Sequence, residues 1–172
     1  LVLMERRRQR VPLRAAPFAG MAAESVVYAL LFGLVVGTAT QWMLGGIPTR
    51  LAADGGSLAS LSLPEGIVLS LGAGIYEELL FRVILAGGLY VLFRSGGLQR
   101  GRSGVFAALL SALAFSAFHY IGPYGDPWEL TSFTFRFLSG LALSALFLLR
   151  GFGIAAWTHA LYDVFLMVAR GL

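Results

Sequence analysis

The chain has 172 residues, of which 58% are apolar and only 13% are charged, whereas soluble domains carry about 25% charged residues. This composition excludes an ordinary soluble domain and predicts an integral membrane protein in a lipid bilayer. The absence of cysteine excludes disulfide frameworks, thiolate metal sites and a cysteine nucleophile. The formal net charge of +4 comes from arginines at the ends of apolar segments, so nucleic-acid binding is not expected.

The first predicted element is a membrane-spanning helix over residues 26–44. At about 1.5 Å per residue it is long enough to cross a hydrocarbon layer of about 30 Å, and it is longer than the apolar region of a signal peptide. A basic head precedes it, which the positive-inside tendency places in the cytoplasm (Arg6, Arg7, Arg8, Arg10 and Arg14). The glycine-rich residues 45–61 are predicted to form a loop.

A second helix is predicted to begin at the sequence SLPE. Ser62 and Glu65 have the spacing of a capping box, and Pro64 is tolerated in the first helical turn. The apolar pattern continues to about Phe93, and a kink or break is expected at the glycine pair 87–88.

Three further spans are predicted over residues 105–121, 130–149 and 154–168. A basic loop at 94–104, a turn-rich segment at 122–130 and a tight connection at 150–153 separate them. The fold class is therefore an all-α integral membrane protein, a bundle of about five transmembrane helices. The distribution of arginine favours a cytoplasmic N-terminus, and the membrane expected is the inner membrane of a bacterium.

Seven ionisable residues fall inside the predicted spans. In hydrocarbon each arginine or aspartate costs roughly 2.5–3.5 kcal/mol on insertion scales, so these residues are expected to face one another inside the bundle. Such a cluster is a candidate functional site. Its members are Glu77, Glu78, Arg82, His119, Arg136, His159 and Asp163.

Residues four apart share one face of a helix, which predicts two local pairs. Glu78 and Arg82 form the first, and each keeps the other charged in a medium of low dielectric constant. His159 and Asp163 form the second, in which the carboxylate can fix the orientation of the imidazole ring.

Two residues are left without a local partner, and together they suit the activation of water. Glu77 lies about 100° around the helix from its acidic neighbour, and His119 has no acid within one turn. A glutamate can polarise a water, a histidine can share its proton, and a second donor such as His159 can stabilise an oxyanion.

Three short motifs then stand in order on separate apolar segments: EELLFR at 77–82, FSAFH at 115–119 and HALYD at 159–163. They match the patterns E-E-x-x-x-R, F-x-x-x-H and H-x-x-x-N/D. In these motifs the sequence resembles the CAAX protease and bacteriocin-processing family of intramembrane glutamic-type endopeptidases. The resemblance covers about residues 67–168.

The resemblance implies an α-helical bundle with the site within the membrane. Its four-helix catalytic core belongs to a unit at 63–172, and residues 1–62 are left as a separate head, first helix and loop. It implies an endopeptidase that cleaves a membrane-anchored or lipid-associated protein or peptide without a cofactor. Glu77 would activate water with His119, and His159 would hold the oxyanion, while Glu78 and Arg82 would support the geometry.

Members that act on prenylated proteins commonly carry asparagine at the position of Asp163. A carboxylate donates no hydrogen bond unless it is protonated, so the role expected for Asp163 is to orient His159. A prenylated substrate is accordingly implied less directly.

Two other functions remain open on the same residues. Two histidines and a carboxylate could bind zinc with water in the fourth position, which would make a zinc-dependent membrane protease. The cluster could also belong to a non-catalytic immunity or scaffold protein, or move protons. The sequence does not give the oligomeric state.

Arg136 is expected to lean outward to Glu129, although it could also counter the glutamates or grip a substrate carboxylate. Depth along the helices is a difficulty for the site. Glu77 and His119 lie roughly 24 Å from the inner ends of their spans and His159 about 12–14 Å, so straight parallel helices would not bring them together. A tilted, kinked or partly re-entrant segment is therefore expected.

Overall fold

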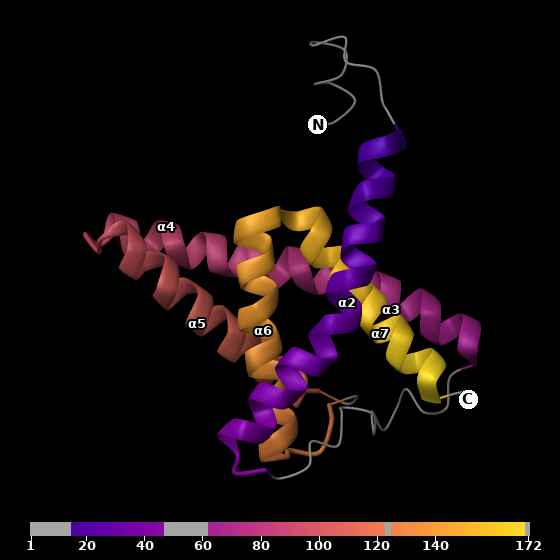
Figure 1. Cartoon of the computed structure of the whole chain (residues 1–172). Helices are drawn as coiled ribbons and strands as arrows, with labels where there is room; N and C mark the ends of the chain where they lie inside the picture. The colour runs from indigo at the N-terminus through magenta and orange to yellow at the C-terminus, as the bar shows by residue number, and fades with distance from the viewer. Residues whose placement is uncertain (1–14, 47–61, 123–124, 171–172) are drawn as a thin grey trace.

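The computed structural model describes residues 15–46, 62–122 and 125–170, and every regular element within them is helical. The all-α fold class predicted from the sequence is confirmed. α3, η2 and α4 follow one another without a gap, so the described residues form five helical rods (Figure 1). The elements are α2 (Ala15–Met43), α3 (Leu63–Glu78), the π-helical η2 (Leu79–Ala86), α4 (Gly87–Ser95), α5 (Arg100–Phe118), α6 (Leu130–Arg150) and α7 (Phe152–Arg170).

Four helices among the described residues are long and apolar enough to cross a membrane: α2, α5, α6 and α7. The other expected span corresponds to the rod made of α3, η2 and α4, which is divided between three shorter helices. The protein is thus an integral membrane protein. The proposed boundary between residues 62 and 63 stays a prediction, and the basic head and most of the loop at 45–61 lie outside the described residues.

α2 begins at Ala15, well before the predicted start at residue 26. The charged Glu24 lies two residues before the predicted start, and its carboxylate accepts two hydrogen bonds from the guanidinium of Arg150, each 2.6 Å long. This fork between α2 and the end of α6 compensates the charge, so the helix continues through it.

α5 begins at Arg100, inside the segment that was predicted to be a basic loop, and the connection from α4 is short. Gly97 has a φ of 89°, and the Arg94 guanidinium donates to the carbonyl of Leu98 at 2.6 Å. α5 also ends three residues before the predicted boundary at 121, which leaves His119 at its C-cap. α6 and α7 agree with the predicted spans within two residues, and only Gly151, with a φ of 88°, lies between them.

The predicted capping box at the start of α3 is present, with the amide and hydroxyl of Ser62 donating to the Glu65 carboxylate at 3.0 and 2.6 Å. The predicted break at residues 87–88 is wrong. Gly87 has α-helical angles, φ −60° and ψ −46°, and the irregular stretch is η2, directly before it. Inside η2 the carbonyl of Phe81 accepts a hydrogen bond from the hydroxyl of Ser111 on α5 at 2.5 Å, which holds the wider turn in place.

Close backbone contacts at glycines set the packing around the site. A Cβ atom on Gly74 of α3 would lie 2.6 Å from the amide nitrogen of Ala160 on α7, so only glycine allows this approach. A Cβ on Gly140 of α6 would lie 3.0 Å from the Cα of Ala112 on α5. Small residues at helix crossings are the usual device for close packing in membranes.

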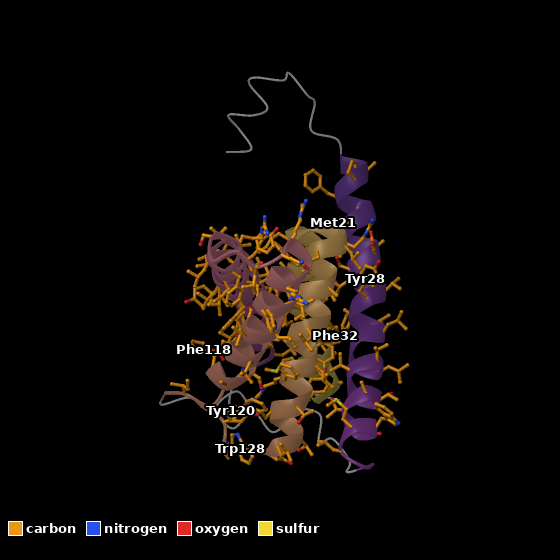
Figure 2. The ribbon with its side chains drawn as sticks, turned by 90° about the vertical axis from the view of Figure 1, so that its left-hand side faces the viewer. Met21, Tyr28, Phe32, Phe118, Tyr120 and Trp128 are labelled. Atoms are coloured by element: carbon orange, nitrogen blue, oxygen red, sulfur yellow. The ribbon has the colours of Figure 1, made fainter. Side chains whose placement is uncertain are left out.

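α2 covers the outside of this core, against α6 and α7. Its residue Phe32 points toward α6 in Figure 2 and packs edge-to-face on Tyr162 of α7, with ring centroids 5.1 Å apart. The opposite face of α2 exposes large apolar side chains such as Leu34 to lipid. Tyr120 and Trp128 lie together at one end of the bundle, as aromatic residues at a membrane interface do (Figure 2).

Candidate active site

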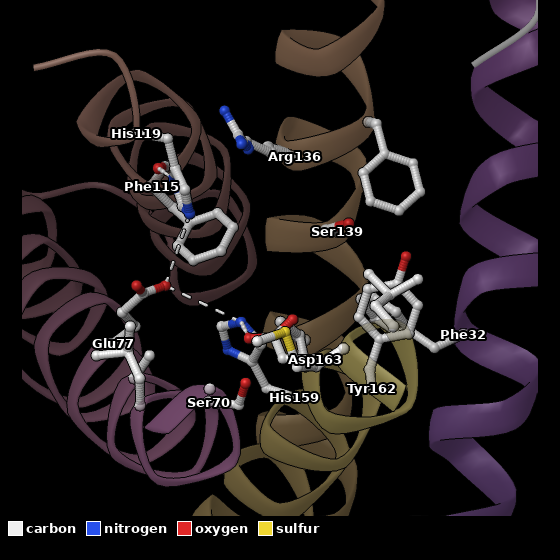
Figure 3. Close-up of a pocket in the computed structure, with 17 residues that line it drawn as sticks. Phe32, Ser70, Glu77, Phe115, His119, Arg136, Ser139, His159, Tyr162 and Asp163 are labelled. Atoms are coloured by element: carbon white, nitrogen blue, oxygen red, sulfur yellow. Dashed lines mark hydrogen bonds and ion pairs between the residues drawn. The ribbon is translucent and has the colours of Figure 1, made fainter. Parts of the chain in front are cut away.

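The predicted cluster lines one cavity of about 320 Å³, whose lining comes from α3, α5, α6 and α7, with Phe32 of α2 on one side. The ionisable residues in its lining are Glu77, His119, Arg136, His159 and Asp163 (Figure 3). Glu78 and Arg82 lie directly behind this lining, with side-chain exposures of 0% and 1%. The fold therefore brings together all seven ionisable residues that the sequence singled out.

Glu77 stands between the two histidines. Its Oε2 lies 3.9 Å from Nε2 of His119 and 4.0 Å from Nε2 of His159, the two contacts that Figure 3 marks with dashed lines. This oxygen is buried and has no hydrogen-bond partner among the residues that the structure describes. A buried carboxylate oxygen without a hydrogen-bond partner destabilises the fold unless another group, such as a water molecule or a ligand, donates to it.

His119 presents a defined nitrogen to Glu77 because of its position at the end of α5. Its Nδ1 lies 2.8 Å from the carbonyl oxygen of Phe115, one turn earlier. A carbonyl oxygen can only accept, so Nδ1 carries the hydrogen and donates it. In the neutral ring Nε2 then keeps its lone pair, which makes it a proton acceptor on the side of Glu77.

His159 is held by an acid on another helix. Its Nδ1 lies 2.9 Å from Oε1 of Glu78 on α3, while Oδ2 of Asp163 lies 3.5 Å from its Nε2. The predicted proximity of His159 and Asp163 is therefore present, but the acid that orients the ring through Nδ1 is Glu78. Because residues four apart share a helical face, the sequence indicated Asp163 as a neighbour of His159, but it could not indicate a partner on a different helix.

Glu78 is shared between two cationic partners. Arg82 Nε lies 3.0 Å from Glu78 Oε2, as the spacing predicted, although the alignment is that of an ion pair rather than a hydrogen bond. The guanidinium also donates to the carbonyl of Gly140 on α6 at 3.4 Å and stacks 4.5 Å above the ring of Phe115. One buried carboxylate thus links η2 and α7 to α3, and Arg82 extends the link to α6.

Phe115 has a larger part in the site than the sequence indicated. Its ring is 3% exposed and lies 4.9 Å from the ring of His119 and 5.8 Å from that of His159, in both cases edge-to-face. Together with its carbonyl contact to His119 and its stacking on Arg82, the residue touches three members of the cluster. The spacing of F-x-x-x-H was the available signal, since it puts both rings on one helical face.

Arg136 was expected to lean toward Glu129, but it does not. It pairs with Asp126 in the segment before α6, while Glu129 accepts a hydrogen bond of 2.6 Å from the hydroxyl of Thr131. Asp126 is the better partner because its amide is fixed by a hydrogen bond of 2.9 Å to the carbonyl of His119. This contact fixes Asp126 relative to the end of α5.

The difficulty with depth is resolved by the direction of the long rod. In Figure 1 the rod of α3, η2 and α4 runs at a steep angle across α6, so distance along it is not depth in the bundle. Glu77, in the middle of the rod, can therefore meet His119 at the end of α5 and His159 in the first half of α7.

The two contacts between Glu77 and the histidines are longer than the distance between neighbouring ligand atoms in a zinc site. Bonds of 2.0–2.2 Å in a tetrahedral shell put neighbouring ligand atoms about 3.4 Å apart, and the two contacts of Glu77 are 3.9 and 4.0 Å. Over the described part of the chain no group of three or more histidines, cysteines, aspartates or glutamates is arranged to hold a metal ion.

A family model described as "Type II CAAX prenyl endopeptidase Rce1-like" matches residues 59–165, which is more than half of the chain. The chain belongs to the Rce1-like family. It is accordingly a CAAX-type membrane protease, a hydrolase with apolar helices suited to the lipid bilayer. The Rce1-like match runs from before α3 into α7, so it includes every residue of the cluster and leaves α2 outside. Comparison with curated proteins and with solved structures gives no match.

Proposed function

We propose that this Rce1-like protein hydrolyses a peptide bond of a membrane-associated protein or peptide with a water molecule activated by Glu77 and His119. The observation that carries the proposal is the position of Glu77 Oε2, about equally far from Nε2 of His119 and Nε2 of His159. The distance of 3.9 Å to His119 suits one water that contacts both atoms at about 2.8 Å. A carboxylate and a neutral imidazole are both proton acceptors, as such a water requires.

In the proposed reaction Glu77 and His119 remove a proton from water, and the oxygen attacks the carbonyl carbon of the scissile bond. His159, with a hydrogen on Nε2, donates to the oxyanion that forms, while Glu78 fixes the ring through Nδ1. Collapse of the tetrahedral intermediate breaks the C–N bond. The proton taken from water passes to the departing nitrogen, so the products are one carboxylic acid and one amine.

For Asp163 we propose a role different from orienting the ring. Its Oδ2 lies near the nitrogen that faces the oxyanion, at 3.5 Å from Nε2. A carboxylate here stabilises the positive charge of a protonated His159, which is the form that donates best. An asparagine at this position would instead supply its own hydrogen bond to the oxyanion.

The shape of the cavity suits a substrate with a lipid or apolar segment. From Glu77 it continues along one face of α3 past Ala73 and Leu69 to Gly66, a length of about 16 Å at 1.5 Å per residue. Leu166 and Met167 of α7 line the same end. We therefore propose a membrane-anchored or lipid-associated substrate, and the prenyl endopeptidase description of the family makes prenylated peptides the first to test.

The test is cleavage of prenylated and acylated peptides by the purified protein in detergent, with products identified by mass spectrometry. We expect Glu77→Gln, His119→Ala and His159→Ala to lower the rate by about 10²- to 10⁴-fold, the range for general acid and base groups. Tyr76→Phe, at an exposed neighbour of Glu77, is the matched control and should leave the rate unchanged. Retained cleavage by Glu77→Gln would contradict its assignment as the base.

We also propose that the N-terminus and the connection from α4 to α5 face the cytoplasm of a bacterium. Because the sequence has no cysteine, single cysteines report orientation directly. Gln99→Cys should react with an impermeant maleimide only after the membrane is opened, whereas Trp128→Cys should react in intact cells. The reverse pattern would invert the proposed topology.

A further inference from the structure

Arg136 is a cation in the cavity that the proposed hydrolysis does not use. It lies in the second turn of α6, is 8% exposed, and lines the same cavity as Glu77 and His119. Figure 3 shows its guanidinium extending from α6 toward His119, on the side of the cavity away from Asp163. It is the one arginine or lysine in the described lining.

The guanidinium is fixed on one edge and unoccupied on the other. Nη2 pairs with Asp126, and Cζ lies 5.2 Å from the centre of the Tyr120 ring, within range of a cation–π contact. Nη1 is buried and has no hydrogen-bond partner among the residues that the structure describes. A purely structural arginine is more stable when both of its terminal nitrogens have hydrogen-bond partners. Arg136 has a partner for Nη2 alone, which is the arrangement expected of an arginine that binds a ligand through Nη1.

A second unpartnered donor stands one turn later on α6. Ser139 is 5% exposed, lines the cavity, and its hydroxyl has no hydrogen-bond partner in the described part of the chain. Arg136 and Ser139 are both donors, and their neighbours across the cavity, Glu77 and Asp163, are acids. An anionic group inside the cavity is therefore repelled by Glu77 and Asp163, and on α6 it is attracted to Arg136.

We propose that Arg136 binds the C-terminal carboxylate of the substrate, on the leaving-group side of the scissile bond. Guanidinium groups match carboxylates in geometry and charge, and a site that is nine-tenths buried makes such contacts strong. Arg136 is then a specificity-determining residue. It orients the substrate by its C-terminus and so holds the peptide bonds close to that end near Glu77. The inference rests on the proposed hydrolysis, but it predicts binding as well as rate.

The test compares two probes that differ at one group: N-dodecanoyl-Ala-Leu-Ala-Leu with a free C-terminal carboxylate, and the same peptide with a C-terminal amide. Equilibrium binding is measured in detergent in the non-cleaving Glu77→Gln background. We expect the acid to bind at least about tenfold more tightly than the amide, as for a hydrogen bond to a charged group. Adding Arg136→Gln should bring this ratio to about one, and Arg136→Lys should leave an intermediate value.

Two matched variants separate recognition from structure. Arg150→Gln removes an arginine from the far end of the same helix and should keep the ratio. Asp126→Asn removes the charge that Nη2 pairs with but keeps an oxygen that can accept its hydrogen bond, so it should also keep the ratio. A purely structural ion pair would instead make Asp126→Asn behave as Arg136→Gln does. If Arg136→Gln elutes as aggregate, Arg136→Lys and Asp126→Asn decide the matter.

An equal affinity for the two probes, or no binding of either, would overturn the proposal. So would a ratio that survives Arg136→Gln. The proposed hydrolysis fails separately, if the wild-type protein cleaves no peptide while the preference for the acid probe persists.

Discussion

Replacement of Glu78 by glutamine should lower the free energy of unfolding by more than the similar shape of the two side chains suggests. The side chain is fully buried, and its charge is matched by Arg82, which is 1% exposed, and by His159. Glu78→Gln leaves the guanidinium without a counter-charge, which typically costs about 3–5 kcal/mol when the pair is buried. The amide can still accept from Nδ1 of His159, so that contact changes from a charged to a neutral hydrogen bond and adds about 1 kcal/mol.

The assay is reversible unfolding in mixed micelles, where SDS is titrated in and helicity is followed by circular dichroism. The adjacent variant Glu77→Gln is the isosteric control, since Glu77 has no arginine at ion-pair distance among the described residues, and its unfolding free energy should change by less than about 1 kcal/mol. The double variant Glu78→Gln/Arg82→Met should recover part of the loss, because it removes the uncompensated cation. Equal stability of Glu77→Gln and Glu78→Gln would refute the reasoning.

Three further outcomes follow from other contacts. In the same unfolding assay, Gly74→Ala should lower the free energy of unfolding by about 1–3 kcal/mol, because its Cβ would meet the backbone of Ala160 at 2.6 Å. Gly72 has open space around it, so Gly72→Ala should be neutral or stabilising by up to about 1 kcal/mol. Ser111→Ala should cost about 1–3 kcal/mol and melt η2 first, seen as faster amide exchange after Phe81, because a buried carbonyl loses its donor. Peptide cleavage should survive 1,10-phenanthroline at concentrations that inactivate a known zinc protease in the same detergent, and loss of activity restored by zinc would instead favour the metal-dependent alternative.

Contacts within one helix were predictable from the sequence because helical geometry fixes them. The ion pair of Glu78 with Arg82 and the proximity of His159 to Asp163 both follow from a spacing of four residues. The capping box at Ser62 depends only on local chemistry in the same way. The three motifs also indicated the family before any geometry was known.

Contacts between helices were not predictable, because they depend on crossing angles that no local pattern encodes. Depth was counted along straight parallel helices, so Glu77 and His159 appeared to lie at different levels, whereas the rod of α3, η2 and α4 crosses the bundle steeply. The choice of Asp126 over Glu129 as partner of Arg136 depends on a hydrogen bond to the end of α5. The predicted start of α2 was wrong for a similar reason.

The start of α2 shows this dependence on tertiary contacts. A charged residue at position 24 ends an apolar window when the sequence is read alone, but Arg150, 126 residues later, neutralises it. The π-helical η2 has no glycine or proline within it, and its wider turn is supported by Ser111 of another helix. The glycine pair that follows permits a bend without imposing one.

Glu77 and Glu78 are consecutive in the chain, so their Cα atoms are about 3.8 Å apart and move together. Because Glu78 is immobilised by partners on η2 and α7, the backbone under Glu77 is held in place by contacts that Glu77 itself does not make. The contacts that restrict conformational freedom are therefore made by Glu78, while Oε2 of Glu77 has no hydrogen-bond partner among the described residues and is open to a reactant. A helix that carried only the reacting glutamate would have to restrain this side chain through contacts to its own carboxylate oxygens. Such contacts would lower the basicity of the oxygens.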